Sequence, residues 1–227
     1  MHPSGKEGST FRSPRGAMPI KVLLADDHQV VRQALKVLLE NEGLEVVGEA
    51  ANGHQAVRLS RELSPDVAVL DLVMPQLNGL DAAPEIRQAS PKTRLVLLTT
   101  QNGEQHVLQA LKAGFKGCVF KSHEAQDLVH AIREVARGRT YLHPEMSEAV
   151  VGGYLGRSEL ADEPLSNRER QVLQLIAEGK RTRQAAEILG VSVKTVESHR
   201  SRIMRKLNIR ETAGLIRYAI RHGLSEL

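Results

Sequence analysis

Residues 67–71 read Val-Ala-Val-Leu-Asp, four apolar residues followed by one carboxylate. An unbroken apolar run of this kind, with two β-branched members, is typical of a strand buried on both faces of a parallel sheet. Asp71 ends the run, and Asn78-Gly79 then turns the chain back. Open parallel sheets bind their ligands at the carboxyl ends of the strands, so Asp71 is a candidate functional residue.

Similar apolar runs recur along the first half of the chain. They lie at residues 20–25, 44–48, 95–98 and 117–120. Between them, apolar residues recur at intervals of three and four, as on one face of an amphipathic helix. This alternation predicts a five-stranded parallel sheet with connecting helices, over about 120 residues. Pro84 falls inside the helix expected at 80–88, and we expect it to kink or shorten that helix.

The predicted strands end in polar residues that the topology would bring together. Right-handed crossovers place the C-terminal ends of all strands at one edge of a parallel sheet. The residues at these ends are Asp26, Asp27, Asp71, Thr99 and Lys121. Asp26 and Lys121 are 95 positions apart, so their meeting would depend entirely on the fold.

Such a cluster has the chemistry of phosphoryl transfer. Neighbouring carboxylates repel one another and suit a hard divalent cation, for which we expect Mg²⁺. Asp71 could act as a nucleophile, while the metal and Lys121 neutralise the phosphoryl oxygens and the Thr99 hydroxyl donates a hydrogen bond. In the simpler alternative, the carboxylates only cap turns and helices and Lys121 is a surface cation.

Composition limits the class of protein. Aromatic residues make up 3% of the 227 residues and Trp is absent, so the core must consist mainly of Leu, Ile, Val and Ala. The single cysteine, Cys118, excludes an internal disulfide and is expected to be a small buried residue. No apolar run approaches the roughly 18 residues of a membrane span. Residues 1–17 lack the apolar segment of a secretory signal, so we expect a disordered tail and a cytoplasmic protein.

Charge is distributed unevenly along the chain. From residue 165 onward there are 13 Lys and Arg against 6 Asp and Glu, whereas the preceding part has 18 against 21. A basic third attached to an acidic body suggests that the end of the chain meets a polyanion. Glycines 152, 153 and 156, followed by the stretch 159–164, indicate a flexible joint before this basic part.

The basic part has the pattern of a helix-turn-helix. Ser166 and Glu169 have the spacing of a capping box for a first helix that ends at Gly179. A short helix at 183–189, a turn at Gly190 and a longer helix from Val193 to about residue 207 follow. Val196, Ile203 and Leu207 recur at helical spacing and should face the core of this domain.

The opposite face of the longer helix is polar and fits the width of a DNA major groove. Glu197 could accept a hydrogen bond from cytosine, and Ser198 and Ser201 could bond either base type. The basic residues are better placed for phosphates, which set register but not sequence. They are Lys194, Arg200, Arg202, Arg205 and Lys206. The alternative is a basic helix that is merely solvated.

Residues 20–137 resemble a response-regulator receiver domain, which has a flavodoxin-like fold. The motifs that carry the resemblance are Asp26-Asp27, Leu70-Asp71-Leu72-Val73-Met74-Pro75, Asn78-Gly79, Thr99 and Lys121. The resemblance implies that Asp71 accepts phosphate from a sensor histidine kinase. It also implies that Asp27, Asp71 and the Val73 carbonyl ligate the metal with help from Asp26, and that Thr99 and Lys121 sense the phosphate. Cys118 and Thr100 depart from the family, which usually has an aromatic and a small residue there.

Residues 165–224 resemble the DNA-binding domain of the NarL/FixJ (LuxR-type) regulators. The matching motifs are Leu165-Ser166-Asn167-Arg168-Glu169, Ala177-Glu178-Gly179, Ser192-Val193-Lys194-Thr195-Val196, His199, Lys206-Leu207 and Arg217-Tyr218-Ala219. The resemblance adds Thr195 and His199 to the expected DNA contacts. Leu215, Ile216, Ala219 and Ile220 line one face of the last helix, which suggests a homodimer on inverted half-sites of double-stranded DNA.

The expected molecule is thus an α/β doubly wound five-stranded sheet followed by an all-α four-helix domain. We expect a tail at 1–17, a receiver at 18–138, a linker at 139–164 that is helical and then flexible, and a DNA-binding domain at 165–227. The expected function is phosphorylation-controlled transcription regulation, with RNA polymerase as a further partner, and not enzymatic catalysis. An aspartyl-phosphate phosphohydrolase would usually carry a second Asp where this chain has Val73. A regulator that binds DNA without phosphate is the other alternative, prompted by Cys118 and Thr100.

Overall fold

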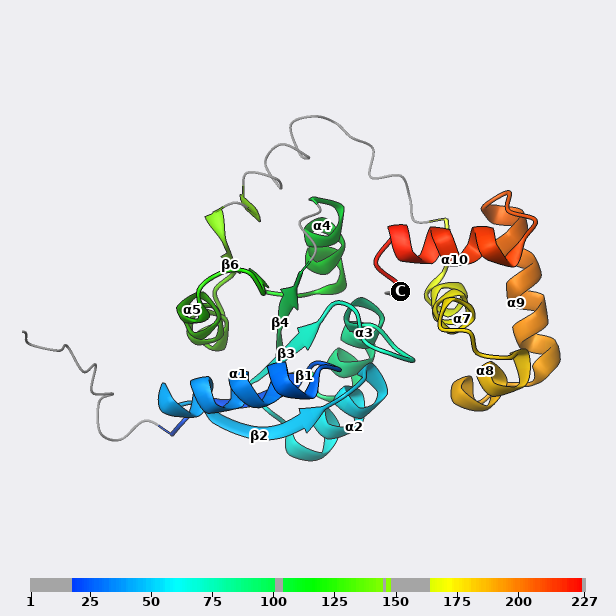
Figure 1. Cartoon of the computed structure of the whole chain (residues 1–227). Coiled ribbons are helices and arrows are strands. Elements are labelled where there is room, and N and C mark those ends of the chain that lie inside the picture. Colours follow the sequence, from blue (N-terminus) through cyan, green and yellow to red (C-terminus); the bar gives the residue numbers. More distant parts are fainter. Residues whose placement is uncertain (1–17, 101–103, 145, 148–163, 226–227) are drawn as a thin grey trace, which may run out of the picture.

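The computed structural model describes residues 18–100, 104–144, 146–147 and 164–225. The predicted tail at 1–17 and the linker from 148 to 163 lie outside these residues. The described parts form an N-terminal α/β domain and a C-terminal helical domain (Figure 1).

The N-terminal domain is built on one parallel sheet. Its strands are β1 (Lys21–Ala25), β2 (Glu45–Ala50), β3 (Val67–Asp71), β4 (Arg94–Thr99), β5 (Gly117–Phe120) and β6 (Tyr141–Leu142). They lie in the order β2-β1-β3-β4-β5-β6, and every neighbouring pair is parallel. The prediction of five strands was therefore one short. The sixth is a two-residue edge strand in which the Tyr141 amide donates to the Lys116 carbonyl at 2.8 Å, where helix had been expected.

Helices cover both faces of this sheet, which confirms the doubly wound architecture. One core cluster packs α2 (Gly53–Leu63), α3 (Gly79–Ala89) and α4 (Glu104–Ala113) against the sheet. The other cluster packs α1 (Gln29–Asn41) and α5 (Ala125–Ala136) against the opposite face. Alternate residues of the central strands serve the two clusters, as in β3, where Leu70 faces the first and Val69 the second.

Two local predictions have clear outcomes in this domain. Pro84 lies in the middle of α3, yet the helix continues without interruption from Gly79 to Ala89, so the prediction that it would shorten the helix was wrong, while the expected kink stays a prediction. Cys118 is fully buried in the first core cluster, as expected, and burial raises the pKa of its thiol to about 12. A thiol of this kind stays protonated at neutral pH and acts as a packing residue.

The C-terminal domain consists of four helices around its own core. They are α7 (Asn167–Ala177), α8 (Thr182–Leu189), α9 (Val193–Lys206) and α10 (Thr212–Arg221). The predicted capping box is present at the start of α7, where the Ser166 amide donates to the Glu169 carboxylate at 2.9 Å. Gly190 ends α8 with a left-handed conformation (φ +63°), and the Ser192 hydroxyl caps α9. These signals produce the expected helix-turn-helix.

Candidate functional site

The strand ends of the N-terminal domain bring the predicted acidic residues to one lysine. Nζ of Lys121, which follows β5, donates to Oδ2 of Asp71 at the end of β3, over 2.7 Å. The same Nζ lies 2.7 Å from Oδ2 of Asp26, which follows β1, in an ion pair that lacks the angles of a directed hydrogen bond. The side chains of Asp26 and Asp71 are only 3% and 8% exposed, so this charge cluster is largely withdrawn from water.

Asp27 joins the cluster from its exposed side. Asp26, Asp27, His28 and Asp71 each offer a ligand atom, and these atoms all lie within 4.8 Å of one another. Nδ1 of His28 is 3.0 Å from Oδ1 of Asp27. The carboxylates fit the oxygen preference of a hard divalent ion. His28 was missed from the sequence, although its position directly after the acidic pair was a signal for it.

The electrostatics of the cluster suit a nucleophilic carboxylate. Burial raises the pKa of Asp71 to about 6, against the attraction of Lys121, and the neighbouring Asp26 and Asp27 charges raise it further. Burial acts to lower the pKa of Lys121, but the Asp71 charge, the hydrogen bond to Asp71 and the close ion pair with Asp26 outweigh it and raise that pKa. At neutral pH the lysine is therefore charged and most of Asp71 is ionised.

Thr99 and the loop after Asp71 complete this edge of the sheet. Thr99 ends β4 and is buried, and its carbonyl accepts a 2.8 Å hydrogen bond from the Lys121 amide. Thr100 is exposed. Gly79 begins α3 so close to the phosphoacceptor candidate that a Cβ there would lie 2.2 Å from the Asp71 carbonyl oxygen. Only glycine permits this approach of the helix to the strand end.

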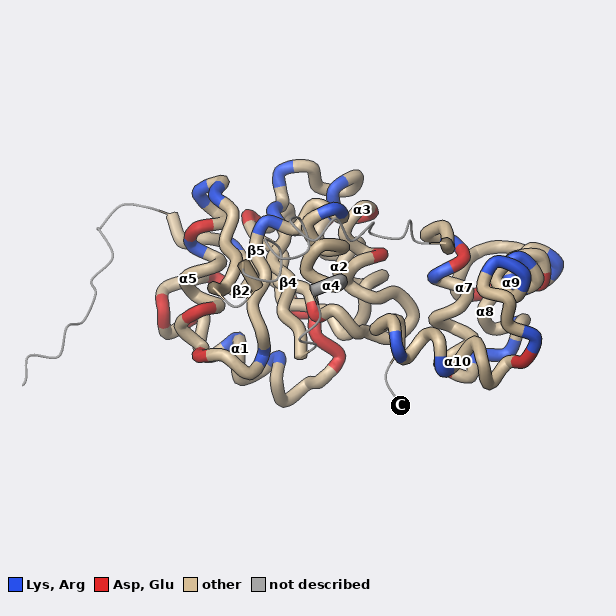
Figure 2. The backbone as a smooth tube through the Cα atoms, turned by 90° about the horizontal axis from the view of Figure 1, so that it is seen from above, with Lys and Arg blue, Asp and Glu red and all other residues tan. Residues whose placement is uncertain are grey.

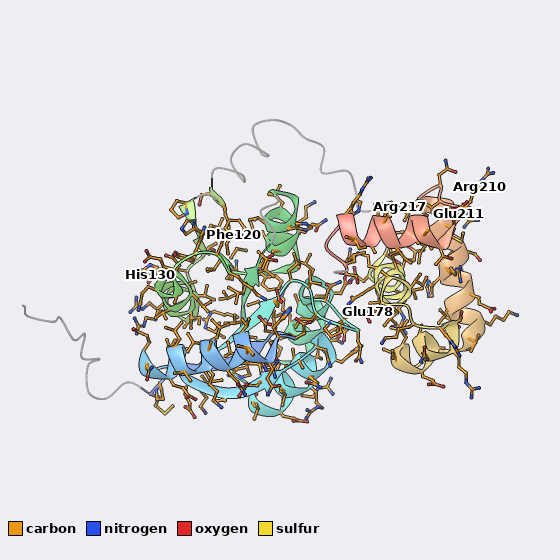
Figure 3. The ribbon with its side chains drawn as sticks, in the orientation of Figure 1. Phe120, His130, Glu178, Arg210, Glu211 and Arg217 are labelled. Carbon is orange, nitrogen blue, oxygen red and sulfur yellow. The ribbon has the colours of Figure 1, made fainter. Side chains whose placement is uncertain are left out.

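The C-terminal domain touches the loop that follows Asp71. In α7, the Gln174 side chain accepts from the Asn78 amide at 3.1 Å and donates to the Met74 carbonyl at 2.7 Å. Glu178, on the side of α7 that faces the N-terminal domain (Figure 3), accepts from the Gln76 amide at 2.8 Å. The loop at 74–78 is therefore held by one helix of the other domain.

A buried ion pair anchors the same helix to α3. Nε of Arg170 donates to Oδ1 of Asp81 at 2.9 Å, and a second guanidinium nitrogen also contacts this oxygen. Asn78 caps α3 by accepting from the Asp81 amide at 2.8 Å, so the cap and the ion pair share one carboxylate residue. None of these contacts was predicted, because polar residues on α7 have the same sequence pattern as a solvated helix face.

The helix α9, which carries the proposed DNA-contacting residues, lies on the side of the C-terminal domain that is remote from the N-terminal domain (Figures 1 and 2). Val196 and Ile203 are buried in the core, as the helical spacing predicts. Most of the predicted contact residues are exposed, whereas Thr195, His199 and Arg200 are half-buried. The exposed ones are Lys194, Glu197, Ser198, Ser201, Arg202, Arg205 and Lys206. Lys and Arg gather on this helix in Figure 2.

Lys206 differs from the other predicted phosphate contacts. Its Nζ lies 2.6 Å from Oε2 of Glu169, the residue that closes the capping box of α7. Burial acts to raise the pKa of Glu169, but hydrogen bonds from Lys206 and Ser166 hold it below its usual range. Lys206 thus ties α9 to α7 within the domain.

Comparisons with known proteins cover both domains. Residues 22–133 match the response regulator receiver domain, and residues 163–219 match the luxR family of bacterial regulatory proteins. The transcriptional regulatory protein MctR of Rhizobium johnstonii is 36% identical over 206 residues, covering 90% of this chain and 95% of MctR. The oxygen regulatory protein NreC of Staphylococcus epidermidis is 37% identical over 217 residues, covering 91% and 100%.

A solved structure shows the same two-domain organisation. RcsB of Salmonella enterica serovar Typhimurium, bound to promoter rprA in the presence of the phosphomimetic BeF3⁻, is 26% identical with a TM-score of 0.63, covering 88% of this chain and 98% of RcsB. Together the domains define a DNA-binding response regulator, a class of transcription regulators and not of enzymes. The chain belongs to the NarL/FixJ (LuxR-type) family of these regulators. Among the residues described, no helix is both long and apolar enough to cross a membrane.

Proposed function

We propose that Asp71 is the phosphoacceptor of this response regulator and that a sensor histidine kinase is its phosphodonor. The observation that supports this proposal most directly is the 2.7 Å hydrogen bond between Lys121 Nζ and Asp71 Oδ2. The buried carboxylate is a nucleophile at the carboxyl edge of the sheet, and the lysine is a fixed cation beside the oxygens that would receive the phosphoryl group. Thr99, adjacent to Lys121 at the end of β4, supplies the hydroxyl for the same group.

We further propose that Asp27, Asp71 and the Val73 carbonyl hold Mg²⁺, with Asp26 supporting it. When bound, the ion would neutralise the phosphoryl oxygens. The acidic ligand set supports this assignment, because its oxygens cluster within 4.8 Å. Asp71 would supply the oxygen that attacks the phosphoryl group, and the Lys121 ammonium would compensate the negative charge of the Asp71 carboxylate.

On the DNA side, the exposed face of α9 would lie in the major groove of double-stranded DNA. Lys194, Arg202 and Arg205 would contact phosphates, and Glu197, Ser198 and Ser201 would face base edges. Ile216 and Ile220 of α10 are only partly buried, which supports pairing of two copies through this helix and binding to inverted half-sites. This function places the protein in the cytoplasm, with RNA polymerase as a further partner.

The contacts of α7 could couple phosphorylation of Asp71 to DNA binding. Val73, a proposed metal ligand, lies between Asp71 and Met74, and the Met74 carbonyl is bound by Gln174. Phosphorylation adds about 1.5–2 negative charges beside this loop, which would favour a loop conformation that releases α7. Release of α7 would let the DNA-binding domain reorient, so that two copies could pair through α10 and place α9 of each copy on DNA. It would not uncover α9, since that helix already faces away from the receiver (Figure 1).

Phosphorylation of the purified full-length protein by acetyl phosphate, followed by mass spectrometry, tests the site. We expect addition of a single phosphoryl group that requires Mg²⁺ and is lost in Asp71→Ala. Asp66→Ala is a matched control, since Asp66 is a carboxylate at the other end of β3, where its Oδ2 accepts from the Lys21 amide. Labelling that survives Asp71→Ala would show that another residue is the phosphoacceptor.

A further inference from the structure

A second group of metal-ligand side chains lies outside the acidic cluster. His123 follows Lys121 in the turn after β5, Asp127 lies in the first turn of α5, and His143 follows β6. Each of the three offers a ligand atom, and these atoms lie within 4.8 Å of one another. All three side chains are partly buried.

Packing holds these groups in place. The imidazole rings of His123 and His143 have centroids 3.7 Å apart, and His123 also packs edge-to-face on Phe120. Phe120, labelled in Figure 3, ends β5. Nε2 of His143 lies 3.9 Å from Oδ2 of Asp127. Nδ1 of His143 is buried and has no hydrogen-bond partner in the described part of the chain.

Asp127 is positioned by a neighbour as metal-binding carboxylates commonly are. The Tyr141 hydroxyl lies 3.5 Å from Oδ1 of Asp127, a long hydrogen bond that leaves Oδ2 directed toward His143. Tyr141 is itself packed edge-to-face against His130 at a centroid distance of 5.3 Å. Supporting contacts of this kind orient ligands for a metal.

We propose that His123, Asp127 and His143 form a binding site for a first-row transition-metal ion of the Zn²⁺ type. Two imidazole nitrogens and one carboxylate oxygen are ligands preferred by Zn²⁺ and its neighbours, whereas Mg²⁺ prefers an all-oxygen set. A triangle with 4.8 Å edges has its corners about 2.8 Å from its centre, compared with about 2.0–2.2 Å for Zn²⁺ bonds to these groups. Small side-chain rotations close this difference, and a fourth position stays open for water.

The site connects three segments of the receiver. An ion bound there ties the turn after Lys121 to α5 and to the residues that lead out of β6 toward the DNA-binding domain. The strand β6 has two residues and lies at the edge of the sheet, so the ion stabilises that edge where the chain leaves it. Binding therefore stabilises the receiver and does not require phosphorylation.

Zn²⁺ titration of the full-length protein by isothermal calorimetry, in excess Mg²⁺ to occupy the acidic cluster, tests the proposal. We expect one Zn²⁺ equivalent and a rise in Tm. Affinity should fall at least 10–100-fold in His123→Ala and in His143→Gln, which preserves side-chain size. Co²⁺ bound at the site should show a d–d absorption spectrum that both variants lose. His54→Ala, on α2 at the opposite face of the sheet, is the matched control and should bind normally.

Asp27→Asn separates this site from the acidic cluster and should leave the Zn²⁺ equivalent intact. Loss of Zn²⁺ binding in Asp27→Asn, with retention in His143→Gln, would assign the ion to the acidic cluster and overturn the proposal. Absence of saturable Zn²⁺ binding in the wild-type protein would overturn it as well, and would leave the two imidazoles as a packing contact. Circular dichroism of each variant verifies that it is folded.

Discussion

Arg170 of the DNA-binding domain and Asp81 of the receiver form an ion pair, with Nε 2.9 Å from Oδ1, in which the aspartate side chain is fully buried. This pair lies at the start of α3, directly after the loop that begins at the proposed phosphoacceptor. It is therefore the strongest candidate for holding the two domains together in the unphosphorylated protein.

Arg170→Ala should separate the domains. Removing one partner of a buried pair leaves an uncompensated charge, at a cost of about 3–5 kcal/mol in comparable cases, and undocking lets water solvate Asp81 instead. We expect a larger radius of gyration by small-angle X-ray scattering, and tighter DNA binding by about 5–150-fold, the usual range of allosteric coupling. Arg183→Ala removes an exposed pair with Glu187 on α8 and should change neither quantity. Unchanged scattering in Arg170→Ala would show that the ion pair does not hold the domains together.

Gly79→Ala should lower the stability of the receiver more than an ordinary glycine replacement does. The new Cβ would lie 2.2 Å from the Asp71 backbone oxygen, which cannot move without disturbing the site. Overpacking of this type costs about 1–3 kcal/mol, measured as the free energy of unfolding in urea. Gly48→Ala is the control, because its Cβ would meet the end of the flexible Leu63 side chain. Equal losses in the two variants would argue against a special constraint at Gly79.

The pKa of Asp71 predicts a stability that depends on pH. Burial raises it from 3.8 to about 6, so the folded state binds a proton more tightly than the unfolded state. The contribution of this group is full below about pH 4 and is lost as the pH rises through 6, by up to about 3 kcal/mol. Without divalent metal, wild type should thus lose unfolding free energy relative to Asp71→Asn between pH 4 and 7. A difference between the two proteins that is constant across this range would contradict the raised pKa.

Lys206 and Arg205 are adjacent on α9 but should act differently. Arg205 is exposed and free to reach a phosphate, so Arg205→Gln should weaken DNA binding and reduce the salt slope of log K by about 1. Lys206 is paired with buried Glu169, so Lys206→Gln should lower the stability of the DNA-binding domain while changing the salt slope little. Fluorescence anisotropy over a series of salt concentrations distinguishes the two. The reverse pattern would make Lys206 the phosphate contact.

Local signals in the sequence were sufficient for most of the fold. The apolar run at 67–71 and the alternation around it led to the parallel sheet, and topology then brought Asp26 and Lys121 together. β6 was missed because two residues carry no periodicity, and its pairing with β5 is a tertiary contact. The uninterrupted course of α3 through Pro84 likewise depends on packing, since Ala83 and Ile86 on either side are buried in the core.

No local signal in the sequence predicted the contacts between the two domains. Gln174 is fully buried, yet a glutamine on an amphipathic helix is usually exposed. No sequence signal predicted the grouping of His123, Asp127 and His143 either, because the fold brings them together from three separate segments. Long-range polar pairings of this kind follow from the assembled structure and not from residue spacing.

The most direct test of the central claim is the affinity of the full-length protein for DNA selected from a random pool, measured with and without Mg²⁺ and BeF3⁻. If phosphorylation of Asp71 controls DNA binding, the phosphoryl analogue should tighten binding of the wild type at least about fivefold and leave Asp71→Asn unchanged. Equal affinity of the wild type in both conditions, or an equal gain in Asp71→Asn, would contradict this account.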